Sequence, residues 1–196
     1  MVKDLAMKPF QSSFLSCEKD TEIILRKLFV ESRPYSDDLK RLLVINTKDC
    51  LDDKTNPIYQ KKIQEMGLKE LMEQGYVGQQ LTIKYEEFPE VKSRIAINFD
   101  KFSPNATNPE FRDCNVIFTI LSFSEVNDLG NYRRRDLKIA GFIDGILQNS
   151  RLTGIGTFQL LNGEFLPLDE KLSGYVLIYR AIHGSDDGLP ESDKIV

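Results

Sequence analysis

Histidine is the side chain that most often serves as a catalytic base, and this chain contains a single one, His183. A serine or cysteine nucleophile needs such a base held beside it by its neighbours. His183 lies at the start of a charged C-terminal segment, so we expect an exposed terminal residue. The sequence therefore argues against Ser-His-Asp and Cys-His catalysis, and we expect a protein without enzymatic activity.

The spacing of the cysteines and carboxylates argues against a metal site or another cofactor. Cys17, Cys50 and Cys114 lie far apart and form no CxxC pair, so neither zinc nor a disulfide framework is expected. We expect small apolar fillers or reduced surface thiols. Carboxylates adjacent in sequence do not converge on a strand or helix, and three such pairs are therefore expected to be solvated: Asp52-Asp53, Glu86-Glu87 and Asp186-Asp187.

The glycines of residues 152–158, LTGIGTF, are a weak signal for phosphate binding. No GK[ST] follows them, and the segment leads into a predicted strand and not into a helix N-terminus. We expect a tight turn from helix to strand in which one or both glycines have a positive φ angle.

Three consecutive arginines, Arg133, Arg134 and Arg135, fall in the first turn of a predicted helix. Positive charge there opposes the helix dipole by about 0.3 to 1 kcal/mol for each exposed residue. Residues placed against propensity are candidates for a contact, so we predict that the three, with Lys138, form an interface with acidic groups of a neighbouring subunit or with DNA phosphates. The alternative is a solvated triplet that needs no explanation in a chain with 26 basic residues.

Composition places the chain among ordinary globular proteins, with 41% hydrophobic and 29% charged residues. We expect a single domain over residues 1–184 and a flexible acidic tail over 185–196. No apolar run is long enough to span a membrane, and the first residues lack the apolar core of a secretory signal, so we expect a protein that stays inside the cell. The net charge of −4 argues against general affinity for nucleic acid.

The first half of the chain predicts helices and an insertion. Residues 21–30 are expected to form a helix capped by Asp20 or Thr21 and ending before Pro34. A short helix should follow from about Ser36, with Leu39, Leu42 and Leu43 on one face. Residues 1–20 are expected to be an arm. The polar stretch 46–79 is expected to be an elaboration on the core, with one modest helix ending near Gly75, or only a mobile surface connection.

The second half predicts a sheet and its covering helix. Alternation predicts half-buried strands over 81–88 and 93–102 as an antiparallel pair, and a strand buried on both faces over 114–123. A helix over 132–152, with Asn131 as its N-cap, should pack on the sheet through Leu137, Ala140, Ile143 and Leu147, widened by Ile139, Phe142 and Ile146. Asn162-Gly163 predicts a hairpin turn, and 172–182 the last strand. The expected fold class is α+β, with a mostly antiparallel sheet packed by one main amphipathic helix.

The region from 114 to 184 resembles the tail-terminator and head-tail connector proteins of tailed bacteriophages. The similar features are a strand, an arginine-bearing helix, a short turn and a final strand of the form G-Y-x-L-x-Y, and the N-terminal helices are also similar. The matching positions are Arg135, Ile139, Ile143, Asp144, Ile146, Leu147, Leu152, Gly154, Ile155, Gly156, Gly174, Tyr175, Leu177 and Tyr179. The insertion 46–79 departs from the compact members of that family.

The resemblance implies a non-enzymatic virion protein of the neck or tail, assembled in the host cytoplasm into a ring, usually of six copies. Its partners would be copies of itself, the tail tube or sheath, and head-completion or portal-side neck proteins, with DNA passing through the lumen without specific binding and no membrane involved. Two other functions stay open. One is a monomeric protein-binding inhibitor, and the other is a metal-dependent nuclease whose carboxylates converge from the insertion and the strands.

Overall fold

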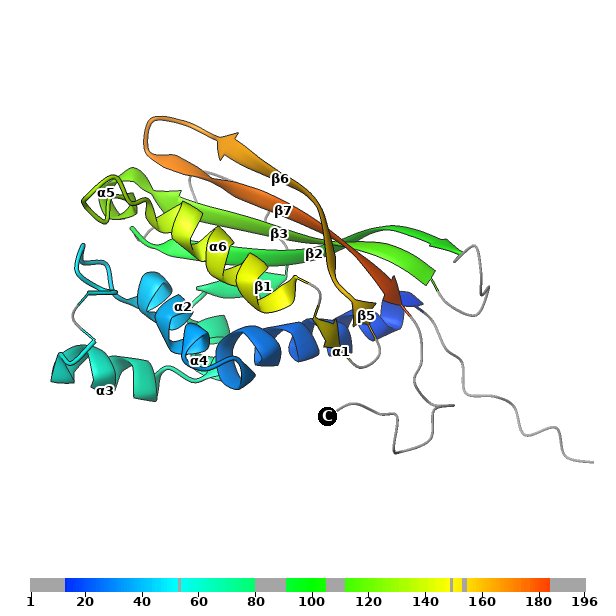
Figure 1. The fold of residues 1–196 in the computed structure, drawn as a ribbon, viewed down its shortest axis with the longest axis horizontal. Coiled ribbons are helices and arrows are strands. Elements are labelled where there is room, and N and C mark those ends of the chain that lie inside the picture. Colours follow the sequence, from blue (N-terminus) through cyan, green and yellow to red (C-terminus); the bar gives the residue numbers. More distant parts are fainter. Residues whose placement is uncertain are drawn as a thin grey trace, which may run out of the picture.

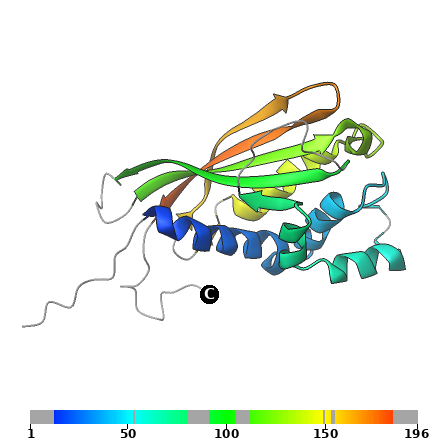
Figure 2. The same ribbon diagram turned by 180° about the vertical axis from the view of Figure 1, so that it is seen from behind.

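The computed structural model describes residues 13–52, 54–79, 91–104, 112–148, 150–152 and 155–183. Helices pack against one face of a twisted sheet, as Figures 1 and 2 show from opposite sides. The helical elements are α1 (Ser13–Arg26), the π-helix η1 (Lys27–Glu31), α2 (Tyr35–Val44), α3 (Pro57–Glu65), α4 (Leu68–Glu73), α5 (Ser124–Asn127) and α6 (Arg135–Leu147).

The sheet has five described strands in the order β1-β2-β3-β7-β6. Adjacent strands of the sheet are antiparallel, except for β1 and β2, which are parallel. The predicted α+β class, with a mostly antiparallel sheet and a central strand over 114–123, is therefore confirmed. The strands are β1 (Val77–Gln79), β2 (Ser93–Pro104), β3 (Arg112–Phe123), β6 (Gln159–Pro167) and β7 (Leu172–His183), and a separate pair is formed by β4 (Arg151–Leu152) and β5 (Gly156–Thr157).

The N-terminal helix begins earlier than predicted. Asp20 and Thr21 are buried inside α1 and are not its caps, because the preceding residues from Ser13 contain no glycine or proline to stop the helix. Residues 13–20 of the predicted arm are thus helical, and residues 1–12 lie outside the described part. The end before Pro34 and the buried face of α2, formed by Leu39, Leu42 and Leu43, are confirmed.

The insertion 46–79 is largely built into the fold. The single predicted helix is two helices, α3 and α4, because Gly67 is extended, with φ −73° and ψ 177°. Asn56 caps α3 by accepting a hydrogen bond of 3.0 Å from the backbone N–H of Ile58. Gly75, at φ 68°, ends the segment near the predicted place. The parallel strand β1 was not predicted, since three residues are too few to show a period.

The main helix α6 packs on β3 and β7, with Ile139, Ala140, Ile143 and Leu147 buried as predicted. Three details of the prediction were wrong. The helix covers residues 135–147 and not 132–152, because Tyr132 lies in a left-handed turn and Arg151–Leu152 form strand β4. Asn131 is not the N-cap, because its φ of 51° places it in a left-handed turn, and the cap position is Arg134. Leu137 is 51% exposed, because the buried stripe of α6 is centred on Ile139 and Ile143.

The closing hairpin turns later than predicted. Asn162 and Gly163 lie inside β6, next to a register shift between Leu160 and Asn162, so this pair accompanies a bulge and not the turn. The turn follows Pro167, where the carboxylate of Asp169 accepts hydrogen bonds of 2.6 and 2.7 Å from the N–H groups of Lys171 and Leu172.

The remaining predictions concern single residues and the ends. Cys50 and Cys114 are buried and Cys17 is half-buried, and none of the three is in a disulfide. Gly156 has a positive φ of 83°, as expected for the turn into β5. His183 ends β7, and its side chain lies outside the described part, as do the predicted strand 81–88 and the tail 185–196. None of the described helices has the length and hydropathy needed to cross a membrane.

Candidate functional site

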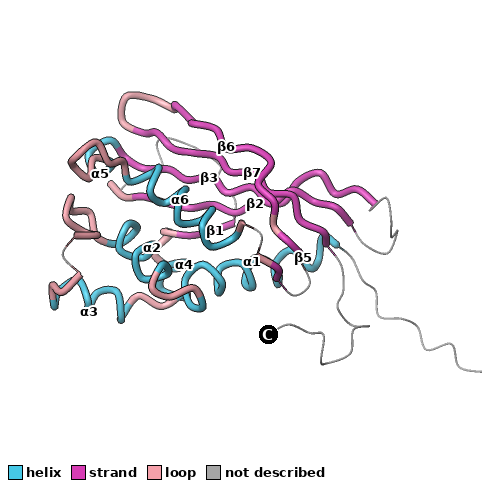
Figure 3. Tube along the Cα trace, viewed as in Figure 1, coloured by secondary structure: helices cyan, strands magenta, loops and turns pink. Residues whose placement is uncertain are grey.

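The three predicted arginines lie where the connection from β3 to α6 meets α2 and the insertion. Figure 3 shows that loops and turns of several elements gather at this end of the molecule. Each arginine points to a different partner within the chain.

Arg135 is fully buried and binds four backbone carbonyl groups. Its guanidinium donates hydrogen bonds of 2.6 Å to Val126, 2.7 Å to Leu42, 2.8 Å to Ile45 and 2.8 Å to Thr47. Leu42 lies in the last turn of α2 and Ile45 is its C-cap, so the positive charge faces the negative end of that helix. Burial lowers the pKa of Arg135, and the neighbouring Cys50 thiol acts in the opposite direction.

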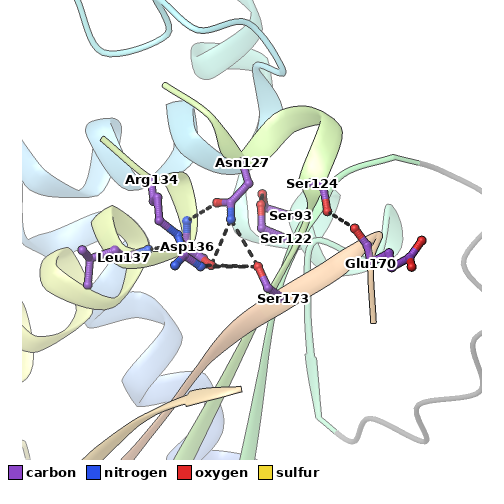
Figure 4. Close-up of polar contacts among 9 residues, drawn as sticks. All are labelled: Ser93, Ser122, Ser124, Asn127, Arg134, Asp136, Leu137, Glu170 and Ser173. Atoms are coloured by element: carbon purple, nitrogen blue, oxygen red, sulfur yellow. Dashed lines mark hydrogen bonds and ion pairs between the residues drawn. The ribbon is translucent and has the colours of Figure 1, made fainter. Parts of the chain in front are cut away.

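Asp136, the next residue, is a buried carboxylate that caps α6 together with Asn127 (Figure 4). Its Oδ1 accepts from the N–H of Leu137 at 2.7 Å, and its Oδ2 accepts from Asn127 Nδ2 at 3.0 Å and from the hydroxyl of Ser173 at 3.2 Å. Asn127 Oδ1 accepts from the N–H of Asp136 at 2.9 Å. Two N–H groups of the first turn, those of Asp136 and Leu137, are thus satisfied from α5 and from the carboxylate itself.

Arg134 links this cap to the closing hairpin. Its Nη2 donates to Asp136 Oδ2 at 2.6 Å, and its guanidinium carbon lies 4.8 Å from the ring centre of Phe165 and 5.9 Å from that of Tyr175. The arginine therefore neutralises the buried carboxylate and stacks on strands β6 and β7 at the same time. Its side chain remains 40% exposed.

Arg133 ties the insertion to the turn that precedes α6. It donates two parallel hydrogen bonds, of 2.8 and 2.7 Å, to the carboxylate of Asp52. A second pair joins the same segments, with Lys48 Nζ 2.5 Å from Asp128 Oδ2. The hydrogen bonds from Arg133 hold the pKa of Asp52 below its usual range, and Lys48 does the same for the pKa of Asp128.

The turn between these residues has an unusual backbone. Gly130, Asn131 and Tyr132 have consecutive positive φ angles of 73°, 51° and 60°. The turn is closed by hydrogen bonds from Leu129 N to Arg133 O at 3.0 Å and from Arg133 N to Gly130 O at 2.9 Å. At its tip the side chain of Tyr132 is fully exposed.

The four predicted interface residues do not form one surface. Arg135 is enclosed within the chain, whereas Lys138 is exposed on α6. The predicted contact of Arg133, Arg134 and Lys138 with a neighbouring subunit or DNA stays a prediction. The opposition of Arg135 to the dipole of α6 is explained by its contact with the C-terminus of α2. The sequence did not predict the roles of Asp136, Asn127 and Asp52. Nothing in the sequence distinguishes these residues from other polar residues, and their roles are seen only from their partners in the fold.

A second feature is the sheet face that the helices leave uncovered. Val116, Phe118 and Ile120 of β3 point to the helices and are fully buried. The alternate residue Ile117 is half-buried on the other face, where it is the register partner of Ile178 in β7. The neighbouring Val176, opposite Thr119, is also half-buried, so apolar side chains continue across this face.

The outer edge of β6 is a third feature. Within the described chain, β6 pairs only with β7. Leu161 and Phe165 on this strand are 53% and 47% exposed. Between Gln159 and Pro167 the only charged side chain is that of Glu164. Such an edge offers unpaired backbone groups and apolar side chains to another chain.

The chemistry of the site is that of fixed hydrogen bonds. The hydroxyls of Ser93 and Ser122 bond to each other at 2.7 Å in the core, and that of Ser173 donates to Asp136. Neither arrangement places a base beside a nucleophile at the surface. No group of three or more histidine, cysteine, aspartate or glutamate residues gathers in the described ranges with the geometry of a metal site.

Comparison with known proteins gives one family and one structural likeness. The YomW family model matches residues 36–181. No curated protein matches the sequence. A solved chain of the "Virion of native gene transfer agent (GTA) particle" is similar at a TM-score of 0.41 and 12% identity, over 65% of this chain and 92% of that one. A TM-score this low carries no functional argument, whereas the family match covers most of the described fold.

Proposed function

This chain belongs to the YomW family, which is phage-derived, and on that premise we propose that it is a non-enzymatic structural protein of a phage-type virion. In the finer form of the proposal it assembles into a ring, of six copies, in the neck. There it acts as a tail terminator or head-tail joining protein around the DNA channel. Its sequence resemblance to those proteins supports this form.

The observation that carries the proposal is the face of the sheet that no described helix covers. Ile117, Val176 and Ile178 are half-buried on that face, and Leu121 is fully buried there, although the described helices cover only the opposite face. A heterologous interface that closes into a ring buries such a face against a different surface of the next copy. Burying apolar area releases about 25 cal/mol per Å², so a ring interface of ordinary size is stabilised by this face.

The buried polar network supports a role in which shape matters. Arg135 and Asp136 join α2, α5, α6 and β7 through hydrogen bonds that are satisfied within the chain. Fully satisfied buried networks fix one arrangement of the elements that they join. A ring subunit that lines a channel for DNA needs a rigid shape, and it does not need catalytic groups.

Partners and location follow from the same proposal. Copies of the chain would contact one another, and the outer surfaces would contact the tail tube or sheath and the head-completion or portal-side proteins. The net charge of −4 is compatible with a lumen through which DNA slides without specific binding. The protein would assemble in the host cytoplasm and remain in the neck of the virion, without a membrane contact.

Native mass spectrometry and negative-stain electron microscopy of the purified chain test the proposal. We expect rings, because a heterologous interface that closes generates a ring, and about six copies, the number that the sequence resemblance implies. Ile178→Asp should abolish them, because it places a charge in the proposed interface. The matched control is Ile58→Asp, since Ile58 is 74% exposed on α3. A stable dimer that cleaves DNA in the presence of a divalent cation would contradict the proposal.

A further inference from the structure

Tyr132 has a left-handed backbone conformation, which residues other than glycine rarely adopt. Its φ of 60° follows that of Asn131, 51°, and both residues have a Cβ atom. Left-handed backbone costs a non-glycine residue about 1 kcal/mol or more, and asparagine tolerates it better than tyrosine. The side chain makes no compensating contact with the described residues of its own chain, because it is fully exposed. No contact within the described fold therefore offsets the free-energy cost of this backbone conformation.

The surrounding residues hold this turn in place. Asp128 accepts a hydrogen bond of 2.8 Å from the N–H of Gly130, and Arg133 donates from Nε to the carbonyl of Gly130 at 3.4 Å. The ion pairs of Arg133 with Asp52 and of Asp128 with Lys48 fix both ends of the turn to the insertion. The ring of Tyr132 is thus presented on a rigid support, and a pre-organised aromatic group loses little entropy when it binds.

A complementary surface exists on the same chain. The edge of β6 exposes Leu161 and about half of Phe165, which suit an aromatic ring, together with backbone carbonyl groups that have no strand partner in the described chain and suit a phenol hydroxyl. The strand's only charged side chain is that of Glu164, and the guanidinium of Arg134 lies 4.8 Å from the ring centre of Phe165, where it leaves 47% of that residue exposed. In a heterologous interface two different patches of the same chain meet, one from each copy.

We propose that Tyr132 is an assembly contact that docks against the β6 edge, at Leu161 and Phe165, of the neighbouring copy. This inference rests on the proposed ring, and it names the two surfaces that meet. It also explains why a tyrosine occupies a left-handed position that glycine would fill without strain. The hydroxyl of Tyr132 donates to a backbone carbonyl of the neighbour's β6, and its ring packs against the exposed side chains of that strand.

Replacement by glycine separates this role from a structural one. Tyr132→Gly removes the strain, so its melting temperature should equal or exceed that of the unchanged chain. Assembly should nevertheless require a protein concentration roughly ten-fold higher or more, as for the loss of an interface hot spot. The control Ile58→Gly removes another exposed side chain and should assemble normally. A lower melting temperature for Tyr132→Gly together with unchanged assembly overturns the inference.

Photo-crosslinking identifies the surface that Tyr132 touches. With p-benzoylphenylalanine at position 132 of the full chain, we expect crosslinked peptides that contain residues 159–167 of another copy. Rings whose crosslinks fall on other residues would overturn the inference and leave the proposed ring intact. A chain that stays monomeric at high concentration in native mass spectrometry, without crosslinks, would overturn both.

Discussion

Arg133 and Asp52, which are 81 residues apart in sequence, form a bidentate ion pair at 2.8 and 2.7 Å. The pair joins the insertion to the turn that presents Tyr132, and the Asp52 side chain is 55% exposed. Exposed pairs contribute little to global stability, but two parallel hydrogen bonds give this one a defined geometry. Its effect should therefore be seen in the local order of the insertion and in the response to pH.

Asp52→Asn should lower the melting temperature slightly at pH 7, and this difference from the unchanged chain should shrink in acid. Arg133 holds the pKa of Asp52 below the ordinary value of about 3.9. The stabilisation is complete above that ordinary value and is lost as the pH falls through the lower folded-state pKa. Thermal melts between pH 7 and pH 3 measure the difference. Glu125→Gln on α5 is the control, and a difference that grows in acid would contradict the assignment.

Arg135→Met should destabilise the fold by about 3 to 5 kcal/mol, because it leaves four carbonyl groups without their donor, three of them in buried hydrogen bonds. The stability of Arg135→Lys should lie between those of the unchanged chain and Arg135→Met, since an ammonium group offers fewer donors than a planar guanidinium. Urea unfolding measures the free energies, and the lysine variant serves if the methionine variant does not fold. Lys138→Met, on the exposed face of α6, should change stability by less than about 0.5 kcal/mol. Equal effects of the two methionine variants would refute the conclusion that Arg135 holds α6 to the end of α2.

Asn127→Ala should cost about 1 to 2 kcal/mol, because the side chain both accepts from the N–H of Asp136 and donates to its carboxylate. Asn131→Ala tests the cap that the sequence suggested, and Asn131→Gly should cause no loss, because glycine adopts φ 51° without strain. Urea unfolding of the three variants compares the two asparagines. Loss of stability in Asn131→Gly without loss in Asn127→Ala would reverse the assignment.

Two glycines should respond to alanine in opposite ways. Gly141 lies in the interior of α6, where an added Cβ would meet open space, so Gly141→Ala should stabilise by about 0.5 to 1 kcal/mol. At Gly174 of β7 an added Cβ would overlap the carbonyl oxygen of Ile120 on the neighbouring strand β3. Gly174→Ala should therefore disrupt the centre of the sheet. Circular dichroism and urea unfolding measure both effects. A Gly174→Ala protein as stable as the unchanged chain would contradict the prediction, because it would mean that β3 and β7 can move apart at little cost in free energy.

Periodicity predicted the parts of the fold that depend on local pattern. The apolar residues of β3 and the buried stripe of α6 follow from strand and helix spacing, so their place in the core was predictable. Asn131 shows where local rules fail. Asparagine is favoured both at helix N-caps and in left-handed turns, and the choice was decided by Asn127, which supplies the cap from α5.

The candidate site was less predictable because its contacts are long-range. The pattern identified Arg135 as a residue in an unfavourable position but not the reason, which is the C-terminus of α2. The same holds for Asp52, which is one of many acidic residues until Arg133 is placed beside it. Sequence reasoning can thus flag a residue that breaks a rule, whereas the partner that explains it must be found in the fold.

The hydrogen bonds of Arg135 also determine when the end of α2 can reach its native contacts during synthesis of the chain. Three of its four carbonyl partners lie 88, 90 and 93 residues earlier in the chain, at Thr47, Ile45 and Leu42. The carbonyl groups at the end of α2 therefore stay in water while the ribosome makes the residues between, and β3 is likewise made before its partner β7. Contacts this distant close slowly, because the loop entropy is lost before they form. We expect folding to be completed only after the final strand emerges, so that only finished chains could enter the proposed ring.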